Sequence, residues 1–194
     1  SADFLFTNAG HSMKYLPAIL IGALAASPVQ ANPDTPVFVD DAGRSSVSHT
    51  YGGPWEFYVG GGAAAFDCDA DLRPDLFLAG GENTAVLLRN RSRTGGAFRF
   101  ERQPLKIDGS IFKNVLGAYA LDIDNDGLLD LALLRLGENV LLRGLGNCQF
   151  ENANTRWNFD GGNSWTTAFS ATWEKGSSHP TLAFGNYVDR DAQG

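Results

Sequence analysis

The chain has 194 residues, of which 43% are hydrophobic, and a formal net charge of −7. This length and hydrophobic content predict about one globular domain and argue against a disordered chain. The negative charge argues against a nucleic-acid-binding protein, which needs a basic surface, and it fits bound cations.

Residues 13–31 have the form of a secretory signal peptide. Lys14 supplies a positive charge, residues 15–26 form an apolar run, and small residues follow at a cleavage site. The apolar run is too short to span a membrane. The alternative, a buried N-terminal helix, conflicts with Pro17 and Pro28, because proline interrupts helices.

The position of this signal predicts where the mature protein begins. A signal peptide normally starts at the initiator, so translation is expected to begin at Met13. Residues 1–12 are then an upstream, non-native or misassigned stretch, and residues 32–194 form the mature protein. We therefore expect a secreted, periplasmic or cell-surface protein with no transmembrane span after the signal peptide.

The mature part contains an internal repeat. Residues 62–78 match residues 117–133, and the match continues with residues 82–90 against residues 138–144. The first copy reads as four short strands separated by turns rich in Gly, Asn and Asp. These strands are expected near residues 63–66, 76–79, 85–89 and 98–102.

A repeated four-stranded unit of this length is typical of a β-propeller blade. An open sandwich is the alternative, but sandwiches do not repeat their loops so faithfully. We predict an all-β fold, an incomplete propeller with blades at about residues 60–115, 116–164 and 165–194, the last of them incomplete.

The third copy is degraded. Residues 168–169 align with residues 65–66, and residues 179–182 align with residues 73–76. In this alignment Ser170, Thr172 and Thr181 stand where three aspartates of the other copies stand, so no metal is expected there.

Two loops carry aspartate at positions 1, 3, 5 and 9. They are Asp67, Asp69, Asp71 and Asp75 in the first loop, and Asp122, Asp124, Asp126 and Asp130 in the second. A loop that curls around an ion points alternate side chains inward, and Ca²⁺ takes about six to eight oxygen ligands. The backbone carbonyls at position 7, those of Arg73 and Leu128, are expected to add one ligand each, whatever their side chains.

The second loop fits this pattern better than the first. Gly127 at position 6 permits the positive φ of a sharp turn, whereas Leu72 stands there in the first loop. Acidic surface turns without metal are the alternative, but four carboxylates in nine residues repel one another without a cation. Magnesium demands stricter octahedral geometry. We predict two structural Ca²⁺ sites.

At these residues the sequence resembles the FG-GAP, or VCBS, repeat of integrin α-subunit propellers. The shared pattern is a small-residue strand, an Asp-x-Asp-x-Asp-Gly-x-x-Asp loop and an apolar strand. Residues 38–43 and 184–190 are similar to stretches of bacterial exported proteins of the cartilage acidic protein type, which end in an ASPIC/UnbV domain. The resemblance implies a propeller that closes with seven blades, of which this chain is the N-terminal part. Residues 37–39 are then expected to supply the outer strand of the last blade.

These features favour an exported calcium-binding scaffold for protein or glycan binding or adhesion, with an extracellular or periplasmic partner held by loops on a propeller face. The alternative is the propeller part of a secreted calcium-dependent enzyme, of polysaccharide lyase or hydrolase type, whose active site lies outside this chain. His49 and His179 have no neighbouring nucleophile motif, so no catalytic residue is assigned and no enzyme is expected. The four tryptophans favour packing between blades over sugar stacking.

Cys68 and Cys148 are the two cysteines, and an exported protein with an even number invites a disulfide. Cys68 is position 2 of the first loop, between the first and second strands of its blade. Cys148 lies between the third and fourth strands of the next blade. Strands in a blade alternate in direction, so both connections emerge on the same propeller face. A disulfide is therefore possible, and two separate buried thiols are the alternative.

Overall fold

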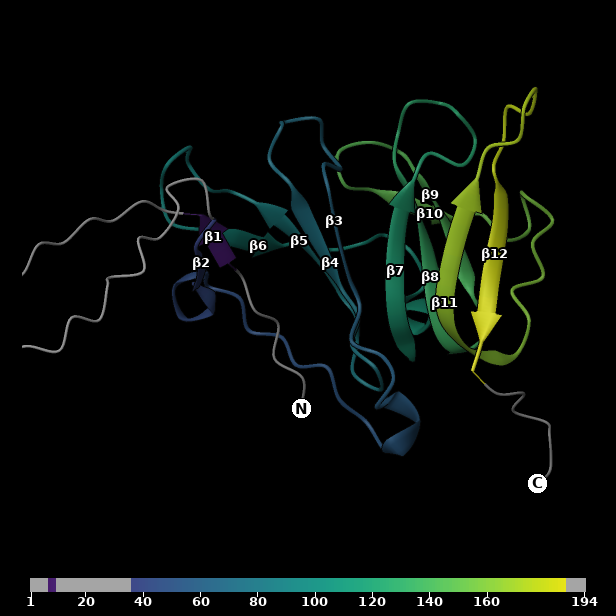
Figure 1. Cartoon of the computed structure of the whole chain (residues 1–194), viewed down its shortest axis with the longest axis horizontal. Coiled ribbons are helices and arrows are strands. Elements are labelled where there is room, and N and C mark those ends of the chain that lie inside the picture. Colours follow the sequence, from purple (N-terminus) through teal and green to yellow (C-terminus); the bar gives the residue numbers. More distant parts are fainter. Residues whose placement is uncertain (1–6, 10–35, 188–194) are drawn as a thin grey trace, which may run out of the picture.

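The computed structural model describes residues 7–9 and 36–187, and the fold is built from antiparallel β-sheets (Figure 1). Three short 3-10 helices, η1 (Ala42–Arg44), η2 (Trp55–Phe57) and η3 (Gly109–Phe112), lie in the connections. Within the described ranges, no helix is long and apolar enough to cross a membrane. The predicted signal peptide, residues 13–31, lies outside the described residues.

The first repeat forms a four-stranded sheet in the order β3-β4-β5-β6. Its strands are β3 (Ala63–Phe66), β4 (Asp75–Leu78), β5 (Val86–Asn90) and β6 (Phe100–Arg102). Side chains of β3 alternate between exposed and buried, as expected for a strand with one packed face. Strand β4 is buried almost throughout: β3 and β5 pair with its two edges, and its Phe77 side chain packs in the larger apolar core.

The second repeat has the same arrangement, with longer inner strands. It consists of β7 (Val115–Leu121), β8 (Asp130–Gly137), β9 (Val140–Gly144) and β10 (Phe150–Asn152). The third repeat contributes β11 (Ser164–Thr172) and β12 (Thr181–Asn186).

The repeats are joined edge to edge in equivalent ways. Gly81, just after β4, bridges to Val115 at the start of β7, and Gly137 at the end of β8 pairs with Ser164 at the start of β11. The first strands β3, β7 and β11 therefore follow one another across the molecule, as Figure 1 shows. This repeated geometry confirms the predicted fold class, an all-β incomplete propeller.

Two apolar clusters hold the repeats together. Between the first two, the aromatic rings of Phe66 and Phe150 meet edge to face at 6.3 Å between centroids. Between the second and third, Phe169 and Phe184 pack against buried Leu121 and Ile123.

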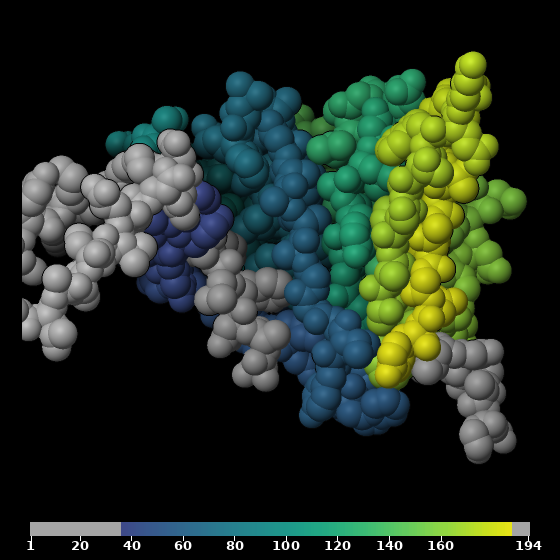
Figure 2. Space-filling model, in the orientation of Figure 1, coloured from purple at the N-terminus to yellow at the C-terminus, as the bar shows by residue number. Residues whose placement is uncertain are grey.

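The tryptophans are divided between packing and exposure. Trp165 is 3% exposed and contacts Trp55, with 5.3 Å between ring centroids, whereas Trp55 is 63% exposed and Trp173 52%. Figure 2 shows the blue segment around η2 against the yellow third repeat, at the end of the molecule away from the β3–β4 connection. Packing between blades thus accounts for Trp165 and for Trp157, which borders the second cluster.

Strand β2 (Phe38–Asp40) pairs with β1 (Thr7–Ala9) in a small separate sheet. From the sequence, residues 37–39 are expected to form the outer strand of a last blade, and residues 1–12 are expected to lie outside the mature protein. An open strand edge pairs with whatever extended segment is available, and in this chain the available segment is β1.

The alignment of the third repeat is corrected by its ladder. Thr172 pairs with Thr181, as Phe66 pairs with Asp75 and Leu121 with Asp130. The third loop therefore spans residues 173–180 and has the same length as the other two. The sequence alignment matched Ala168-Phe169 to Ala65-Phe66 three residues too early, because β11 is longer than β3 and its Ala-Phe pair lies away from the loop. Positions 1, 3 and 5 of this loop are Trp173, Lys175 and Ser177, and Ser170 and Thr172 lie in β11.

Candidate metal centres

Each candidate centre is the connection between the first and second strands of a blade. The β3–β4 and β7–β8 connections lie at the same end of their blades (Figure 1). Both hairpins close with the same register, so position 9 of each loop, Asp75 or Asp130, begins the second strand. The two loops are therefore described position by position.

The carboxylate at position 1 organises the loop backbone. Asp67 accepts amide N–H bonds from Asp71 at 3.2 Å and Leu72 at 2.8 Å. Asp122 accepts the equivalent bonds, from positions 5 and 6 of its loop, at 3.2 and 2.9 Å. Partial burial raises the pKa of Asp67, whereas the hydrogen bonds from the amides of Leu72, Asp71 and their neighbours lower it. The hydrogen bonds together have the larger effect, so the pKa of Asp67 lies below its ordinary value.

The carboxylate at position 9 ties the loop to the third strand. Asp130 is fully buried and accepts N–H bonds from Ile123 at 2.7 Å and from Gly144, at the end of β9, at 2.8 Å. Asp75 accepts the equivalent bonds from Cys68 at 2.9 Å and Asn90 at 2.7 Å. Burial raises the pKa of Asp130 to about 6 and raises the pKa of Asp75, against the lowering effect of these bonds.

The two oxygens of the position 3 carboxylate have different surroundings: one contacts an arginine and the other is buried in the loop. Asp69 pairs through Oδ2 with Arg89, and Asp124 pairs through Oδ2 with Nε of Arg143 at 2.6 Å. The other oxygen of each carboxylate, Oδ1, is buried and has no hydrogen-bond partner. Burying a carboxylate oxygen without a partner lowers the stability of the fold, because the oxygen loses its hydrogen bonds to water and makes no others.

Sequence reasoning missed these two arginines. They occupy the same place in the two repeats, directly after Leu-Leu in the third strand, and the repeat alignment was the available signal. Arg89 and Arg143 offset part of the repulsion among the carboxylates.

The position 5 carboxylates form a further turn bond. Asp71 accepts the amide N–H of Arg73 at 3.0 Å, and Asp126 accepts that of Leu128 at 2.9 Å. The side chain of Arg73 also pairs with Asp71 and donates to the Asn90 carbonyl at 3.3 Å. The Arg73 side chain thus adds contacts to the first loop that the sequence did not predict. The carbonyl ligands of Arg73 and Leu128 stay predictions.

The backbone turns sharply at two positions of each loop. Position 4 has positive φ at Ala70 and Asn125, and position 6 at Leu72, with φ +64°, and Gly127, with φ +84°. The structure thus places Leu72 in the left-handed region that the sequence analysis expected for position 6, and its side chain is exposed.

Each loop gathers carboxylates that can hold a metal ion. In each of two groups, potential ligand atoms of three aspartates lie within 4.8 Å of one another. The groups are Asp67, Asp69 and Asp71, and Asp122, Asp124 and Asp130. The donors are all oxygen and each group includes one unpaired buried atom, so both groups suit a hard cation such as Ca²⁺.

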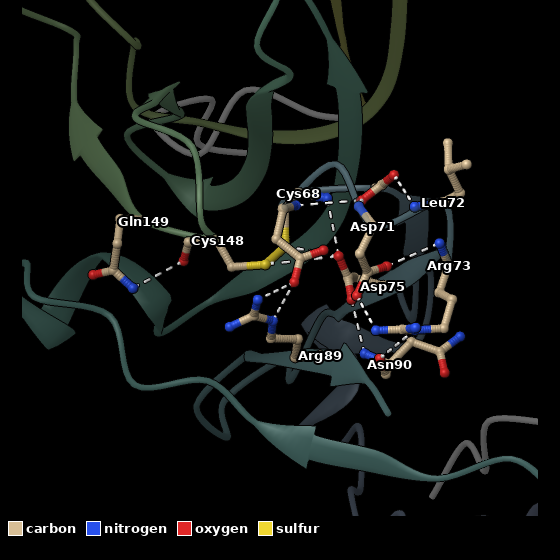
Figure 3. The surroundings of a disulfide bond; sticks show 11 residues. Cys68, Asp71, Leu72, Arg73, Asp75, Arg89, Asn90, Cys148 and Gln149 are labelled. Carbon is tan, nitrogen blue, oxygen red and sulfur yellow. Dashed lines mark hydrogen bonds and ion pairs between the residues drawn. A yellow bond between two sulfur atoms is a disulfide. The ribbon is translucent and has the colours of Figure 1, made fainter. Parts of the chain in front are cut away.

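The predicted disulfide between Cys68 and Cys148 is present (Figure 3). Their Cα atoms are 4.6 Å apart, and the amide of Cys148 donates to the Cys68 carbonyl at 2.9 Å. Asp75 lies beside the bond, with Oδ2 at 2.9 Å from Cys68 Sγ. Because both sulfur atoms are in the disulfide, these three residues are not a metal site.

A cleft of about 390 Å³ separates the two loops. Its walls include Asp67 and Asp69 from the first loop, Gly127 and Leu128 from the second, and Asn147 and Gln149 from the β9–β10 turn.

The comparison with protein families matches this part of the chain. Residues 67–133 match the family model described as an FG-GAP-like repeat, which is about a third of the chain. The matched segment begins at the first aspartate of the first loop and ends within β8, so it includes both loops. No curated protein matches the chain. Residues 67–133 are thus an FG-GAP-like repeat segment carried on an all-β, propeller-like fold.

Proposed function

We propose that the chain is the calcium-binding propeller part of an exported scaffold that binds protein or glycan partners. The observation that carries this proposal is the pair of unpaired buried oxygens, Asp69 Oδ1 and Asp124 Oδ1, at the same position of two equivalent loops. A bound cation would satisfy both atoms and offset the remaining negative charge of each loop. Stabilisation would then follow the ion concentration, because only the folded loops gather the ligands.

Export is supported by two features. The disulfide between Cys68 and Cys148 is of a kind that persists in oxidising compartments. Residues 13–31 have the form of a signal peptide. The resemblance to bacterial exported proteins of the cartilage acidic protein type agrees with both. Sequencing the N-terminus of protein recovered after expression from Met13 tests this part, and an uncleaved cytosolic product would contradict it.

A partner would bind at the end of the blades that carries the two loops. Bound ions would hold the two loops in place, and the disulfide ties the first loop to the β9–β10 turn. This end of the blades would then present a fixed surface, with a cleft between the two loops. We assign no catalytic role to the two described histidines. His49 Nε2 lies 2.8 Å from the Ala79 carbonyl oxygen, and His179 pairs with the adjacent Ser178 in an exposed loop.

Calcium titration of the whole chain by calorimetry tests the metal part of the proposal. We expect two sites in the wild-type chain and one in the Asp122→Ala variant, with a lower melting temperature in chelator than in calcium. Ser177→Ala is the matched control, because Ser177 occupies position 5 of the third loop, where no carboxylate is available. Equal melting temperatures in calcium and in chelator would contradict the proposal.

A further inference from the structure

Arg89 and Arg143 reach the two loops from equivalent places in the fold. In each blade the arginine comes directly after the point where pairing between the second and third strands ends. The last pairs there are Leu76 with Leu88 and Leu131 with Leu142. The ladder therefore places each guanidinium at the base of the loop.

Each arginine binds one oxygen of the position 3 carboxylate and leaves the other for the loop. Arg89 contacts Asp69 through Oδ2, and the Asp69 side chain is only 1% exposed. Arg143 contacts Asp124 through Oδ2 and also pairs with Asp126. In both loops Oδ1 of the position 3 aspartate is buried without a partner. The same division of the two oxygens occurs twice, independently.

We propose that Arg89 and Arg143 are positioning residues for the cations of the two loops. Each guanidinium fixes the orientation of a carboxylate so that Oδ1 is held ready as a metal ligand. Groups that orient a ligating carboxylate in this way typically account for about 10- to 100-fold in metal affinity. The inference rests on the proposed calcium-binding function and adds a role for residues outside the Asp motif.

Repulsion between the guanidinium and a cation would have the opposite effect and lower the affinity for the metal. If the arginine only repelled the ion, substituting the arginine would make the ion bind more tightly. The contacts at the position 3 carboxylate favour positioning, because each guanidinium binds Oδ2 there and leaves Oδ1 free for a cation, while Arg143 also pairs with Asp126. Four aspartates per loop also leave a net negative charge with the arginine in place.

Two substitutions of Arg143 separate geometry from charge. Arg143→Gln removes the charge, and Arg143→Lys keeps the charge but loses the planar fork. The whole chain is titrated by calorimetry with calcium alone as the probe. We expect Arg143→Gln to bind calcium about 10- to 100-fold more weakly at one of the two sites, and Arg143→Lys to lose less affinity there. Arg89→Gln should weaken the other site instead, so each variant carries its own reference site.

A second measurement reports the ligands directly. Terbium bound in place of calcium has a luminescence lifetime that falls with each coordinated water, and we expect Arg143→Gln to add about one water where Asp124 Oδ1 is lost. Arg156→Gln, an exposed arginine after β10, is the control for loss of charge and should change neither readout. Unchanged or tighter calcium binding in both Arg143 variants would overturn the inference. A wild-type chain that bound no calcium would instead overturn the proposed function itself.

Discussion

Each loop aspartate has a backbone contact or an ion pair of its own, besides its predicted role as a metal ligand. Position 1 accepts amides at positions 5 and 6, position 5 accepts the amide at position 7, and position 9 accepts amides from position 2 and the third strand. Hydrogen bonds within the protein therefore help to specify the loop shape. Calcium would then bind a loop that is already close to its final conformation, which lowers the entropic cost of binding.

Leu72 provides a test of backbone strain at a single residue. Its φ of +64° is a conformation that costs a residue with a side chain about 1–2 kcal/mol and costs glycine little. Because the side chain is 91% exposed, its removal loses little packing. We expect Leu72→Gly to raise the free energy of unfolding by about 1 kcal/mol in urea titrations with chelator.

The reciprocal change is the control for that prediction. Gly127→Ala in the second loop, where φ is +84°, should lower the free energy of unfolding by a similar amount. The strain argument fails if Leu72→Gly is neutral or destabilising while Gly127→Ala has no effect.

The buried carboxylate of Asp130 predicts a pH dependence. Burial raises its pKa from 3.8 to about 6, so the cation-free folded state holds this proton more tightly than the unfolded chain does. This group's contribution to stability is present below its unfolded pKa and is lost as the pH rises through about 6. Calcium would bind the ionised form, so we expect calcium affinity at the second loop to increase from about pH 5 to about pH 7. Calorimetric titrations at the two pH values check this, and equal affinities would contradict it.

At the scale of strands and loops, the internal repeat allowed the fold to be predicted from the sequence. Overlaying the two copies located β3 to β5 closely, because short strands bounded by turn residues leave a strong local signal. The Asp pattern likewise located both loops and, through Cys68, one end of the disulfide.

What the sequence analysis missed depended on pairing between strands. The third loop was misplaced because register is set by the ladder between Thr172 and Thr181, and apolar residues along β11 offered a competing match. Arg89 and Arg143 were missed because they lie 14 and 13 residues beyond Asp75 and Asp130, and only the third strand brings them back to the loop. The pairing of β1 with β2 was not foreseen either.

Close approach of neighbouring blades predicts the effect of a substitution at Gly62. A Cβ atom at this position would lie 2.8 Å from Cα of Gly117, at the start of the next blade's inner strand. The amides of Gly61 and Gly62 both donate to the Leu116 carbonyl there, so the backbone is held in place. We expect Gly62→Ala to lower the free energy of unfolding by about 1–3 kcal/mol, as overpacking usually does.

Gly109→Ala is the matched control, because a Cβ atom there meets nothing within 4 Å. Urea unfolding of both variants checks the prediction. If Gly62→Ala were as stable as Gly109→Ala, the two inner strands would have room to separate.

At the scale of the whole molecule, several kinds of contact join the first two blades. An apolar core lies between them, the bridge from Gly81 to Val115 joins the end of β4 to the start of β7, and the disulfide joins the first Asp loop to the β9–β10 turn. Of these, only the disulfide acts on the unfolded chain as well, because it closes a loop between residues 80 apart in the sequence.

Removing the disulfide should therefore lower stability substantially. We expect the double variant Cys68→Ser, Cys148→Ser to lose about 2–4 kcal/mol in the free energy of unfolding, measured in urea under oxidising conditions. Cys148 is fully buried, so part of any loss in the variant could come from placing a hydroxyl in its site. Wild-type protein treated with reductant separates the two causes, because it keeps both sulfur atoms in place. Equal losses in the reduced wild type and the double variant would assign the effect to the cross-link, whereas a reduced wild type as stable as the oxidised protein would contradict the prediction.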